Sequence, residues 1–417
     1  MSSYAKSLSF IFMKVSILNI GDEILAGKIL NTNSYWIKRK LSFLGIFIQS
    51  QATVQDNDKA IISGLNYCIA DQPDYLIITG GLGPTDDDIT RNVLFNFMNV
   101  EAKLDYEYFN FLKNKYKTSN IPINESIKGQ ALIPNIGEFI PNPNGSARGL
   151  KFKKNNTTIF ALPGVPMEMK KMISEYIIPQ IRENINNPIF SRTLRTTGIS
   201  ESELQQRIGK WEKNDKNKIG FYPNIYGVDI RVSNKTSKEI EVFVDWMYRS
   251  FNSYIYSEND TDIEKVIVEE CINNGDTLSI AESCSGGLIG DRITNVSGSS
   301  KIFNGGVVAY SNESKVNILG LKNETLEKFG SVSEETAKCM AQKVKTLFKS
   351  SYGLAVTGIA GPDGGTEEKP VGLVYISLAS NSDTYVEKFT FGSNRKGNKM
   401  KTSQMALNIL RRIILNG

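Results

Sequence analysis

Residues 74–91, "DYLIITGGLGPTDDDITR", decide the fold class of this chain. A run of large apolar residues ends in two glycines, and a polar loop then leads into a helix that we expect from about Asp88. A short apolar run bounded by turn residues is typical of a strand buried on both faces of a sheet. The stretch therefore predicts a parallel sheet whose strand ends open into loops of unusual composition.

Two predicted strands, each followed by a predicted helix, precede this stretch. Residues 14–21 and 46–54 are predicted strands, and residues 32–45 and 58–71 are predicted helices, the first closed by Gly45. Strands that alternate with helices indicate βαβ units with helices on both faces of the sheet. Ligands of such sheets bind at the loops that follow the carboxyl ends of the strands. The unusual residues fall in those loops, namely residues 19–27, 80–91 and 161–170.

Two further α/β blocks follow. In the first, we predict strands at residues 193–199 and 227–234, a helix at 200–211 that opens with a capping box of Ser200 and Glu203, and a strand passing into a helix at 238–251. The second block has five predicted strands and a terminal helix at residues 401–415; its strands are 277–281, 304–311, 352–361, 372–380 and 385–391. The domains expected are a disordered extension at 1–12, a sheet domain at 13–188, a small connecting domain at 189–258 and a last domain at 259–417.

Composition excludes several classes of function. The 417 residues include no histidine, which rules out Ser-His-Asp catalysis and histidine-based zinc sites. A catalytic metal would therefore be a hard cation such as Mg²⁺ with oxygen ligands. The four cysteines form no regular spacing and predict reduced thiols in a cytoplasmic protein. The net charge of +5 is diffuse, no apolar segment approaches a membrane span, and we expect neither nucleic acid nor a membrane as partner.

The loops of the first domain suggest a phosphate and metal site. Gly80, Gly81 and Gly83 let the backbone approach an anion, and the adjacent carboxylates of Asp86, Asp87 and Asp88 could hold a divalent cation. The same carboxylates would also suit a helix N-terminus without any ligand. Further candidates in these loops are Asp22, Glu23, Thr85, Thr90, Arg91, Pro163 and Gly164. Because two acidic loops converge on one sheet edge, we favour a functional site.

The stretch "AESCSGGLIG" (281–290) predicts a strand that turns sharply into a helix and exposes Ser283 as a nucleophile. If the helix begins at Ser285 or Gly286, the backbone N–H groups there could form an oxyanion hole. Cys284 is a second candidate nucleophile, because a helix N-terminus lowers the pKa of a thiol. The alternative is an N-cap serine with close glycine packing.

A lysine can replace the missing histidine as the base. Residues 305–321 predict a strand, a turn and a helix, with Tyr310 at the strand end and Lys315 in the first helical turn. The positive end of a helix dipole disfavours an ammonium ion, so we expect a lowered pKa for Lys315. Glu282 and Glu313 are the other nearby proton acceptors, although carboxylates are poor bases for an alcohol. A solvated surface lysine is the alternative.

The Gly-rich stretch "VTGIAGPDGGTEEKPVG" (356–372) lies between two predicted strands and carries charged residues at Asp363, Glu367, Glu368 and Lys369; a loop of this composition is usually functional or mobile. Arg395 and Lys399 follow further on and could neutralise a phosphate.

Together these motifs resemble one family, the CinA or competence/damage-inducible proteins. The first half resembles its molybdopterin-binding, MogA/MoeA-like domain through "GDEILAGKILNTNSYWI" (21–37), "ITGGLGPTDDDITR" (78–91), "QALIPNIGEFIPNPNGSARG" (130–149) and "ALPGVPMEM" (161–169). The last domain resembles the family's nicotinamide mononucleotide deamidase domain through "AESCSGG" (281–287), "GGVVAYSNESK" (305–315) and "TGIAGPDGGTEEKPVG" (357–372). The fold class implied is α/β: a parallel or mixed MogA-like sheet, a small KH-like middle domain and an α/β C-terminal domain.

The resemblance implies two activities. The C-terminal domain would deamidate nicotinamide mononucleotide without a cofactor, and the N-terminal domain would be an ADP-ribose pyrophosphatase that depends on a divalent metal. The catalytic residues implied are Ser283, Tyr310 and Lys315, with substrate contacts from Ser285, Gly286, Gly361, Asp363, Gly364, Arg395 and Lys399. In the N-terminal domain the implied nucleotide contacts are Gly80, Gly81, Gly83, Thr85, Thr90, Pro163 and Gly164, and the implied metal ligands are Asp22, Glu23, Asp87 and Asp88. A cytoplasmic homodimer is expected.

The chain departs from the family pattern at three places. Ser285 stands where the family has threonine, which keeps a hydroxyl group, and Lys399 stands where the family tends to carry a second arginine. The middle block has no GxxG clamp, which argues against RNA binding. The alternative function is a nucleotide- or molybdopterin-binding or competence-related protein in which one or both domains are inactive; a scaffold for DNA uptake or repair is a third option, disfavoured by the lack of a basic groove.

Overall fold

The computed structural model describes residues 13–46, 48–85, 87–118, 125–185, 189–212 and 217–416. It divides into two compact units, Met1–Phe190 and Ser191–Gly417. The predicted extension at residues 1–12 lies outside the described residues. In the described part, no helix combines the length and apolarity needed to cross a membrane. All four cysteines are free thiols, as expected.

The first unit contains a six-stranded sheet in the order β2-β1-β3-β8-β7-β6. Strands β2, β1, β3 and β8 run parallel, whereas β7 and β6 are antiparallel additions, so the sheet is mixed. The strands span Val15–Ile20 (β1), Ile48–Val54 (β2), Tyr75–Thr79 (β3), Glu138–Ile140 (β6), Gly149–Lys154 (β7) and Thr157–Leu162 (β8).

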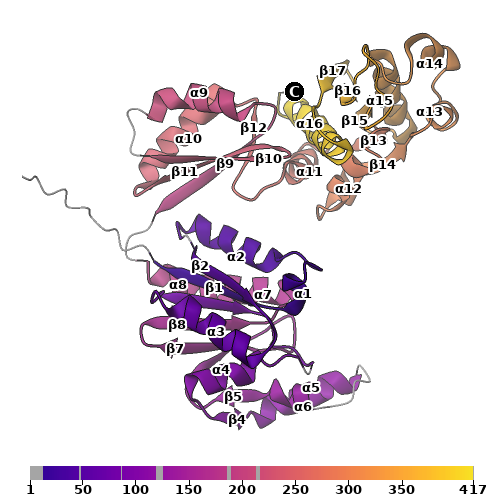
Figure 1. Cartoon of the computed structure of the whole chain (residues 1–417). Helices are drawn as coiled ribbons and strands as arrows, with labels where there is room; N and C mark the ends of the chain where they lie inside the picture. The colour runs from indigo at the N-terminus through magenta and orange to yellow at the C-terminus, as the bar shows by residue number, and fades with distance from the viewer. Residues whose placement is uncertain are drawn as a thin grey trace, which may run out of the picture. The chain divides into compact units, whose positions relative to one another are not determined.

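Helices cover both faces of this sheet (Figure 1). Leu18 and Ile20 of β1 point into a core with helices α3 and α4, whereas Val15 and Ile17 point into a second core with α2, α7 and α8. Alternate strand residues thus reach opposite faces, which explains why the central strand β3, Tyr75–Thr79, is buried at every position. The helices and the π-helical turn of this layer span Asp22–Leu25 (α1), Thr32–Phe43 (α2), Asp58–Ile69 (α3), Thr90–Met98 (α4), Pro166–Met172 (α7), Ile173–Ile177 (η1) and Ile178–Glu183 (α8).

A two-stranded sheet with two helices forms a small subdomain of the first unit. It pairs β4 (Ala102–Leu104) with β5 (Leu132–Pro134) and adds helices α5 (Tyr106–Thr118) and α6 (Glu125–Gly129) around a core of its own. The predictions did not resolve this element, because its strands have only three residues each.

The second unit begins with a four-stranded sheet in the order β10-β11-β9-β12, packed against helices α9 and α10. Its elements span Phe190–Thr196 (β9), Glu201–Glu212 (α9), Lys218–Asn224 (β10), Gly227–Asn234 (β11), Ser237–Phe251 (α10) and Ile255–Glu258 (β12). The predicted strand at the start of residues 238–251 is wrong, because the whole segment is helix α10. Its buried residues Ile240, Phe243, Val244, Met247 and Phe251 recur at helical spacing, which outweighs their β-branched and aromatic character.

The remainder of the second unit is a five-stranded sheet in the order β14-β13-β15-β16-β17. Strands β14, β13 and β15 are parallel, and β16 and β17 are antiparallel. All five predicted strands are confirmed, at Leu278–Glu282 (β13), Phe303–Val308 (β14), Tyr352–Gly358 (β15), Leu373–Ala379 (β16) and Thr384–Thr390 (β17). One face packs on α11, α12 and α16 and the other on α15.

The helices of this region position the site residues that follow. They span Ile263–Asn274 (α11), Leu288–Thr294 (α12), Ser299–Lys301 (η2, a 3₁₀ turn), Asn312–Asn317 (α13), Asn323–Phe329 (α14), Glu334–Phe348 (α15) and Arg395–Asn416 (α16). The predicted terminal helix is too short, because α16 already begins at Arg395. That earlier start places Arg395 and Lys399 on the first turns of one rigid helix.

Candidate functional site

The first unit has a pocket of about 400 Å³ at the carboxyl ends of β1, β3 and β8. The three predicted loops all line it, which confirms their convergence, and the strand order reverses between β1 and β3 at this point. The predicted residues that line the pocket are Gly80, Gly81, Gly83, Pro163, Gly164, Glu23, Asp87 and Asp88. Asp22, Thr85 and Thr90 are not among its lining residues.

Two of these three residues build the loop itself. Asp88 accepts hydrogen bonds from the backbone N–H and the hydroxyl of Thr85, at 2.9 and 2.5 Å, so Thr85 fixes the turn. Thr90 is fully buried behind Gly81, where a Cβ atom would lie 2.1 Å from the Thr90 hydroxyl. Gly81 therefore has no room for a side chain, and Thr90 packs against the loop from behind.

Asp56 is a pocket residue that the sequence interpretation missed. Burial raises the pKa of its carboxyl, and the negative charges of Asp22, Glu23 and Asp87 raise it further. Asp56 also accepts a hydrogen bond of 2.9 Å from the N–H of Asp22. It follows β2, so the rule that points to strand ends could have found it.

The acidic residues are close enough to influence one another but do not form a complete metal cage. Within the described ranges, no three carboxylate or thiol groups gather closely enough to hold an ion. Asp86, a predicted member of the cluster, lies outside the described residues. The donor chemistry suits a hard cation that is shared with a ligand's own oxygen atoms.

The far wall of the pocket is polar and was also missed. Gln130, Ser146 and Glu168 line it, and Glu168 accepts a 2.6 Å hydrogen bond from Asn142. The Gln130 side chain is 1% exposed, and its Nε2 has no hydrogen-bond partner among the described residues. A buried donor without a partner is costly, so this amide is poised for an acceptor atom of a ligand.

The second unit brings Ser283 and Lys315 together. Ser283 directly follows β13, and Lys315 lies on α13 after the neighbouring strand β14. Lys315 Nζ lies 3.2 Å from Ser283 Oγ, and it also donates to the carbonyl oxygens of Ala309 at 3.0 Å and Tyr310 at 3.4 Å. These acceptors hold the amine against the serine, which is the geometry of a nucleophile and its base.

Burial controls the protonation of Lys315. Its side chain is 1% exposed, and loss of solvation lowers its pKa below the ordinary lysine value. The predicted direction therefore agrees, but the predicted cause does not. Helix α13 has only six residues, so Lys315 lies in both its first and its last turn, and the largest cause of the lowered pKa is burial rather than the expected helix dipole. Ser283 is likewise buried at 7% exposure, not exposed as the turn suggested.

Glu282 organises the turn around the serine. Its carboxylate accepts hydrogen bonds from the Ser285 hydroxyl and from the N–H groups of Gly287, Ile289 and Gly290, at 2.6 to 3.1 Å. Helix α12 begins at Leu288, later than the predicted start at Ser285 or Gly286. We expected the Gly286 N–H to belong to an oxyanion hole. It donates instead to the Ser283 carbonyl oxygen.

We predict that Glu282→Ala destabilises the second unit by about 3 kcal/mol, because it leaves several buried donors without an acceptor. Urea unfolding followed by circular dichroism measures this loss. Glu313→Ala is the control, because Glu313 is an exposed carboxylate on α13. Normal stability of Glu282→Ala combined with loss of a Ser283-dependent activity would instead make Glu282 the base.

The Tyr310 side chain contacts Arg395, whereas only the Tyr310 carbonyl contacts Lys315. Arg395 donates to the Tyr310 hydroxyl at 2.5 Å and to the Gly361 carbonyl at 2.6 Å. Lys399 lies nearby, because a Cβ atom on Gly286 would be 3.4 Å from its Nζ. Arg395 thus contacts Tyr310 and Gly361, and Lys399 lies beside Gly286 of the serine turn; we call these two cations, Arg395 and Lys399, the cationic rim.

The Gly-rich loop and Cys284 complete the predicted residues of this unit. Asp363 and Gly364 occupy the exposed part of the Gly-rich loop, together with Glu367 and Glu368. Lys369 of that loop donates to the carbonyl oxygens of Phe329 and Val332, which ties the loop to the end of α14. Cys284 is buried, and burial raises the pKa of its thiol to about 12. The expected thiolate is therefore disfavoured, and Ser283 remains the nucleophile candidate.

Three protein-family models match successive parts of this chain. Residues 16–183 match a probable molybdopterin binding domain, residues 191–246 match the damage-inducible protein CinA KH domain, and residues 260–414 match the CinA C-terminal domain. The fold is accordingly MogA-like in the first unit, with a KH-like block and a CinA C-terminal domain in the second.

Full-length relatives are also similar. A competence-damage inducible protein of Thermoanaerobacter sp. is 39% identical over 97% of this chain and 99% of its own length. A protein of the same name from Caldicellulosiruptor saccharolyticus is 36% identical over 97% of this chain and all of its own length. A solved competence/damage inducible protein of Agrobacterium tumefaciens is 36% identical, covers 38% of this chain and 98% of its own, and has a TM-score of 0.35.

Proposed function

Because the chain belongs to the CinA family of competence/damage-inducible proteins, we propose that it is a bifunctional hydrolase of pyridine nucleotides, with one activity in each compact unit. The second unit deamidates nicotinamide mononucleotide to nicotinate mononucleotide and ammonia. The first unit cleaves the diphosphate of ADP-ribose.

One observation carries the deamidase proposal, the buried pair of Ser283 Oγ and Lys315 Nζ at 3.2 Å. A neutral Lys315 accepts the Ser283 proton as Oγ attacks the carbon of the carboxamide. The proton then passes to the departing nitrogen, which leaves as ammonia, and an ester to Ser283 remains. Water hydrolyses this ester with Lys315 again as base, which releases the carboxylate product and restores the serine.

The cationic rim supports a nucleotide substrate. Arg395 and Lys399 extend from the first two turns of α16 beside the serine loop, where they can bind the phosphate of a mononucleotide. Arg395 can make a bidentate contact, whereas Lys399 supplies a point charge. An anchored phosphate holds the nicotinamide end of the substrate near Ser283.

The pocket of the first unit supports the second activity. Its glycine-lined wall can receive a diphosphate, and its polar far wall offers Gln130, Ser146 and Glu168 to sugar or base atoms. One or two of the pocket carboxylates Glu23, Asp56 and Asp87 would hold a divalent cation in company with the diphosphate, since Mg²⁺ usually combines one or two carboxylates with substrate oxygens. Such an ion, when bound, would polarise a phosphoryl oxygen.

Two assays test these proposals. Purified protein is incubated with nicotinamide mononucleotide and ammonia is measured, and separately with ADP-ribose plus Mg²⁺ and AMP is measured. Release of neither product would overturn the hydrolase assignment. Tight ADP-ribose binding without AMP release would leave the first unit as a nucleotide-binding domain.

We further predict that EDTA suppresses most of the ADP-ribose cleavage and that added Mg²⁺ restores it. Asp87→Asn should raise the Mg²⁺ concentration needed for half-maximal cleavage, because it removes the charge of an acidic pocket residue and so weakens Mg²⁺ binding. Ammonia release by the same sample is the internal control and should not respond to EDTA. Full ADP-ribose cleavage in EDTA would overturn the metal assignment.

A further inference from the structure

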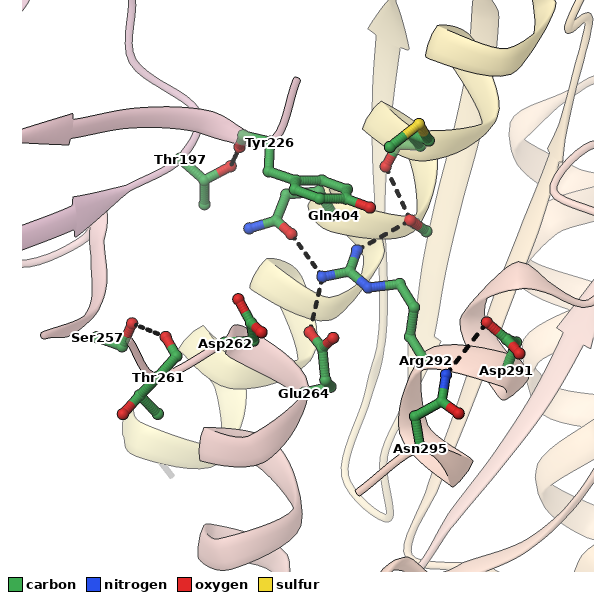
Figure 2. Close-up of polar contacts among 12 residues, drawn as sticks. Thr197, Tyr226, Ser257, Thr261, Asp262, Glu264, Asp291, Arg292, Asn295 and Gln404 are labelled. Atoms are coloured by element: carbon green, nitrogen blue, oxygen red, sulfur yellow. Dashed lines mark hydrogen bonds and ion pairs between the residues drawn. The ribbon is translucent and has the colours of Figure 1, made fainter. Parts of the chain in front are cut away.

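A buried arginine joins the two helices that lead away from the deamidase site. Arg292 lies on α12 and is 7% exposed. Its guanidinium donates to Ser403 Oγ at 2.9 Å and to Gln404 Oε1 at 2.8 Å, both on α16. It also forms a 2.8 Å ion pair with Glu264 on α11 (Figure 2).

These two helices carry the two halves of the site. Glu282, the residue before Ser283, binds the first N–H groups of α12 and so fixes that helix to the nucleophile. Helix α16 begins with Arg395 and Lys399 of the cationic rim. Ser403 lies four residues after Lys399, about one helical turn further along the same helix. The Arg292 contacts therefore connect the helix that follows the serine to the helix that carries the rim.

The middle block covers this arginine. The ring of Tyr226, from the turn between β10 and β11, lies 4.7 Å from the Arg292 guanidinium carbon (Figure 2). The Tyr226 carbonyl accepts a 2.7 Å hydrogen bond from Thr197, and the Thr197 hydroxyl also contacts Met405 Sδ on α16 at 3.8 Å. The aromatic face shields the Arg292–Glu264 pair from water, which strengthens its electrostatic contacts.

We infer that Arg292 is a positioning residue for the deamidase site: it holds the phosphate-binding end of α16 in register with Ser283, under cover of Tyr226 from the middle block. This inference rests on the deamidase function proposed above. It gives the small middle block a role within this chain that needs no nucleic acid.

The test compares two substrates in Arg292→Gln. If Arg292 sets the spacing between rim and serine, the variant should lose its preference for a nicotinamide nucleotide over the nucleoside without a phosphate. We expect the ratio of the two kcat/KM values to fall by about tenfold to a hundredfold, since small displacements forfeit binding energy at the reacting atoms. The rate with the nucleoside should stay near that of the unchanged protein. A purely structural role would lower both rates alike.

Arg195→Gln is the matched control. Arg195 is similarly buried at 6%, and it pairs with Asp229 and Asp262 in the same region, but its partners lie in the middle block and in the turn before α11. Its substrate ratio should not change. Arg292→Lys keeps the charge but cannot span three acceptors on two helices, so we expect at most partial rescue.

Hydrogen–deuterium exchange supplies a readout that does not need the reaction. Amides of residues 395–403 should exchange faster in Arg292→Gln than in Arg195→Gln. If the unchanged protein deamidates neither compound, the proposed function is wrong and exchange alone decides the inference. An unchanged substrate ratio in an active protein, or unchanged exchange in an inactive one, would overturn the inference.

Discussion

Replacement of Ser283 by alanine is expected to lower kcat for deamidation by about 10⁴-fold or more, because it removes the atom that forms the covalent intermediate. The fold should persist, since the Ser283 side chain makes its contact to Lys315 and the turn is held by Glu282. Ammonia release under saturating nicotinamide mononucleotide measures the effect, and circular dichroism confirms the fold.

Cys284→Ala is the control for this substitution. The Cys284 thiol is adjacent in sequence and buried, and its raised pKa keeps it protonated at neutral pH. We expect this variant to retain most of the activity. An active Ser283→Ala together with an inactive Cys284→Ala would reverse the roles of the two residues.

Replacement of Lys315 by methionine should lower the deamidation rate by about 10²–10⁴-fold, the usual contribution of a positioned base. Methionine fills much of the lysine volume, so the loss reports the amine and not a cavity. Combined with Ser283→Ala, the substitution should add far less than its separate effect, because nucleophile and base act as one unit. A fully multiplicative loss would argue against that pairing.

The pH dependence of the deamidation rate is a second test of the role of Lys315. Only neutral Lys315 can accept a proton, so activity should rise as pH rises through its pKa. Burial lowers that pKa, which moves the rise to lower pH than for an ordinary lysine. The rising limb should be missing from the residual activity of Lys315→Met. An identical pH profile in both proteins would show that another group is titrating.

Local pattern was sufficient for most elements and for the main site residues. Strands β1, β2 and β3 of the first sheet, the five strands of the last sheet, the three loops of the first pocket and the Ser283–Lys315 pair follow from apolar runs and the residues at their ends. The antiparallel strands β6 and β7 were not predicted. The segment 238–251 failed because its aromatic and β-branched residues suggest a strand, whereas their spacing is helical. Spacing, not residue type, was the better guide there.

The remaining differences depend on contacts that are distant in sequence or on backbone geometry. Lys315 is buried by residues from other elements, so its sequence neighbourhood suggested the right pKa direction for the wrong reason. The sequence offered Glu282 as a possible base, but in the folded chain its carboxylate accepts hydrogen bonds from the first N–H groups of α12. Gln130 and Arg292 carry no local signature, since an unpaired amide and a bridge between two helices exist only in the folded chain.

The two units have separate hydrophobic cores, which affects how substitutions can accumulate in this chain during evolution. Among the described residues, every hydrophobic cluster draws its members from one unit alone. A mutation that loosens the core packing of one unit therefore acts on the side chains of that unit's own core, because core substitutions act through neighbouring side chains. Substitutions can accordingly accumulate in the core of one unit while the core residues of the other unit stay the same.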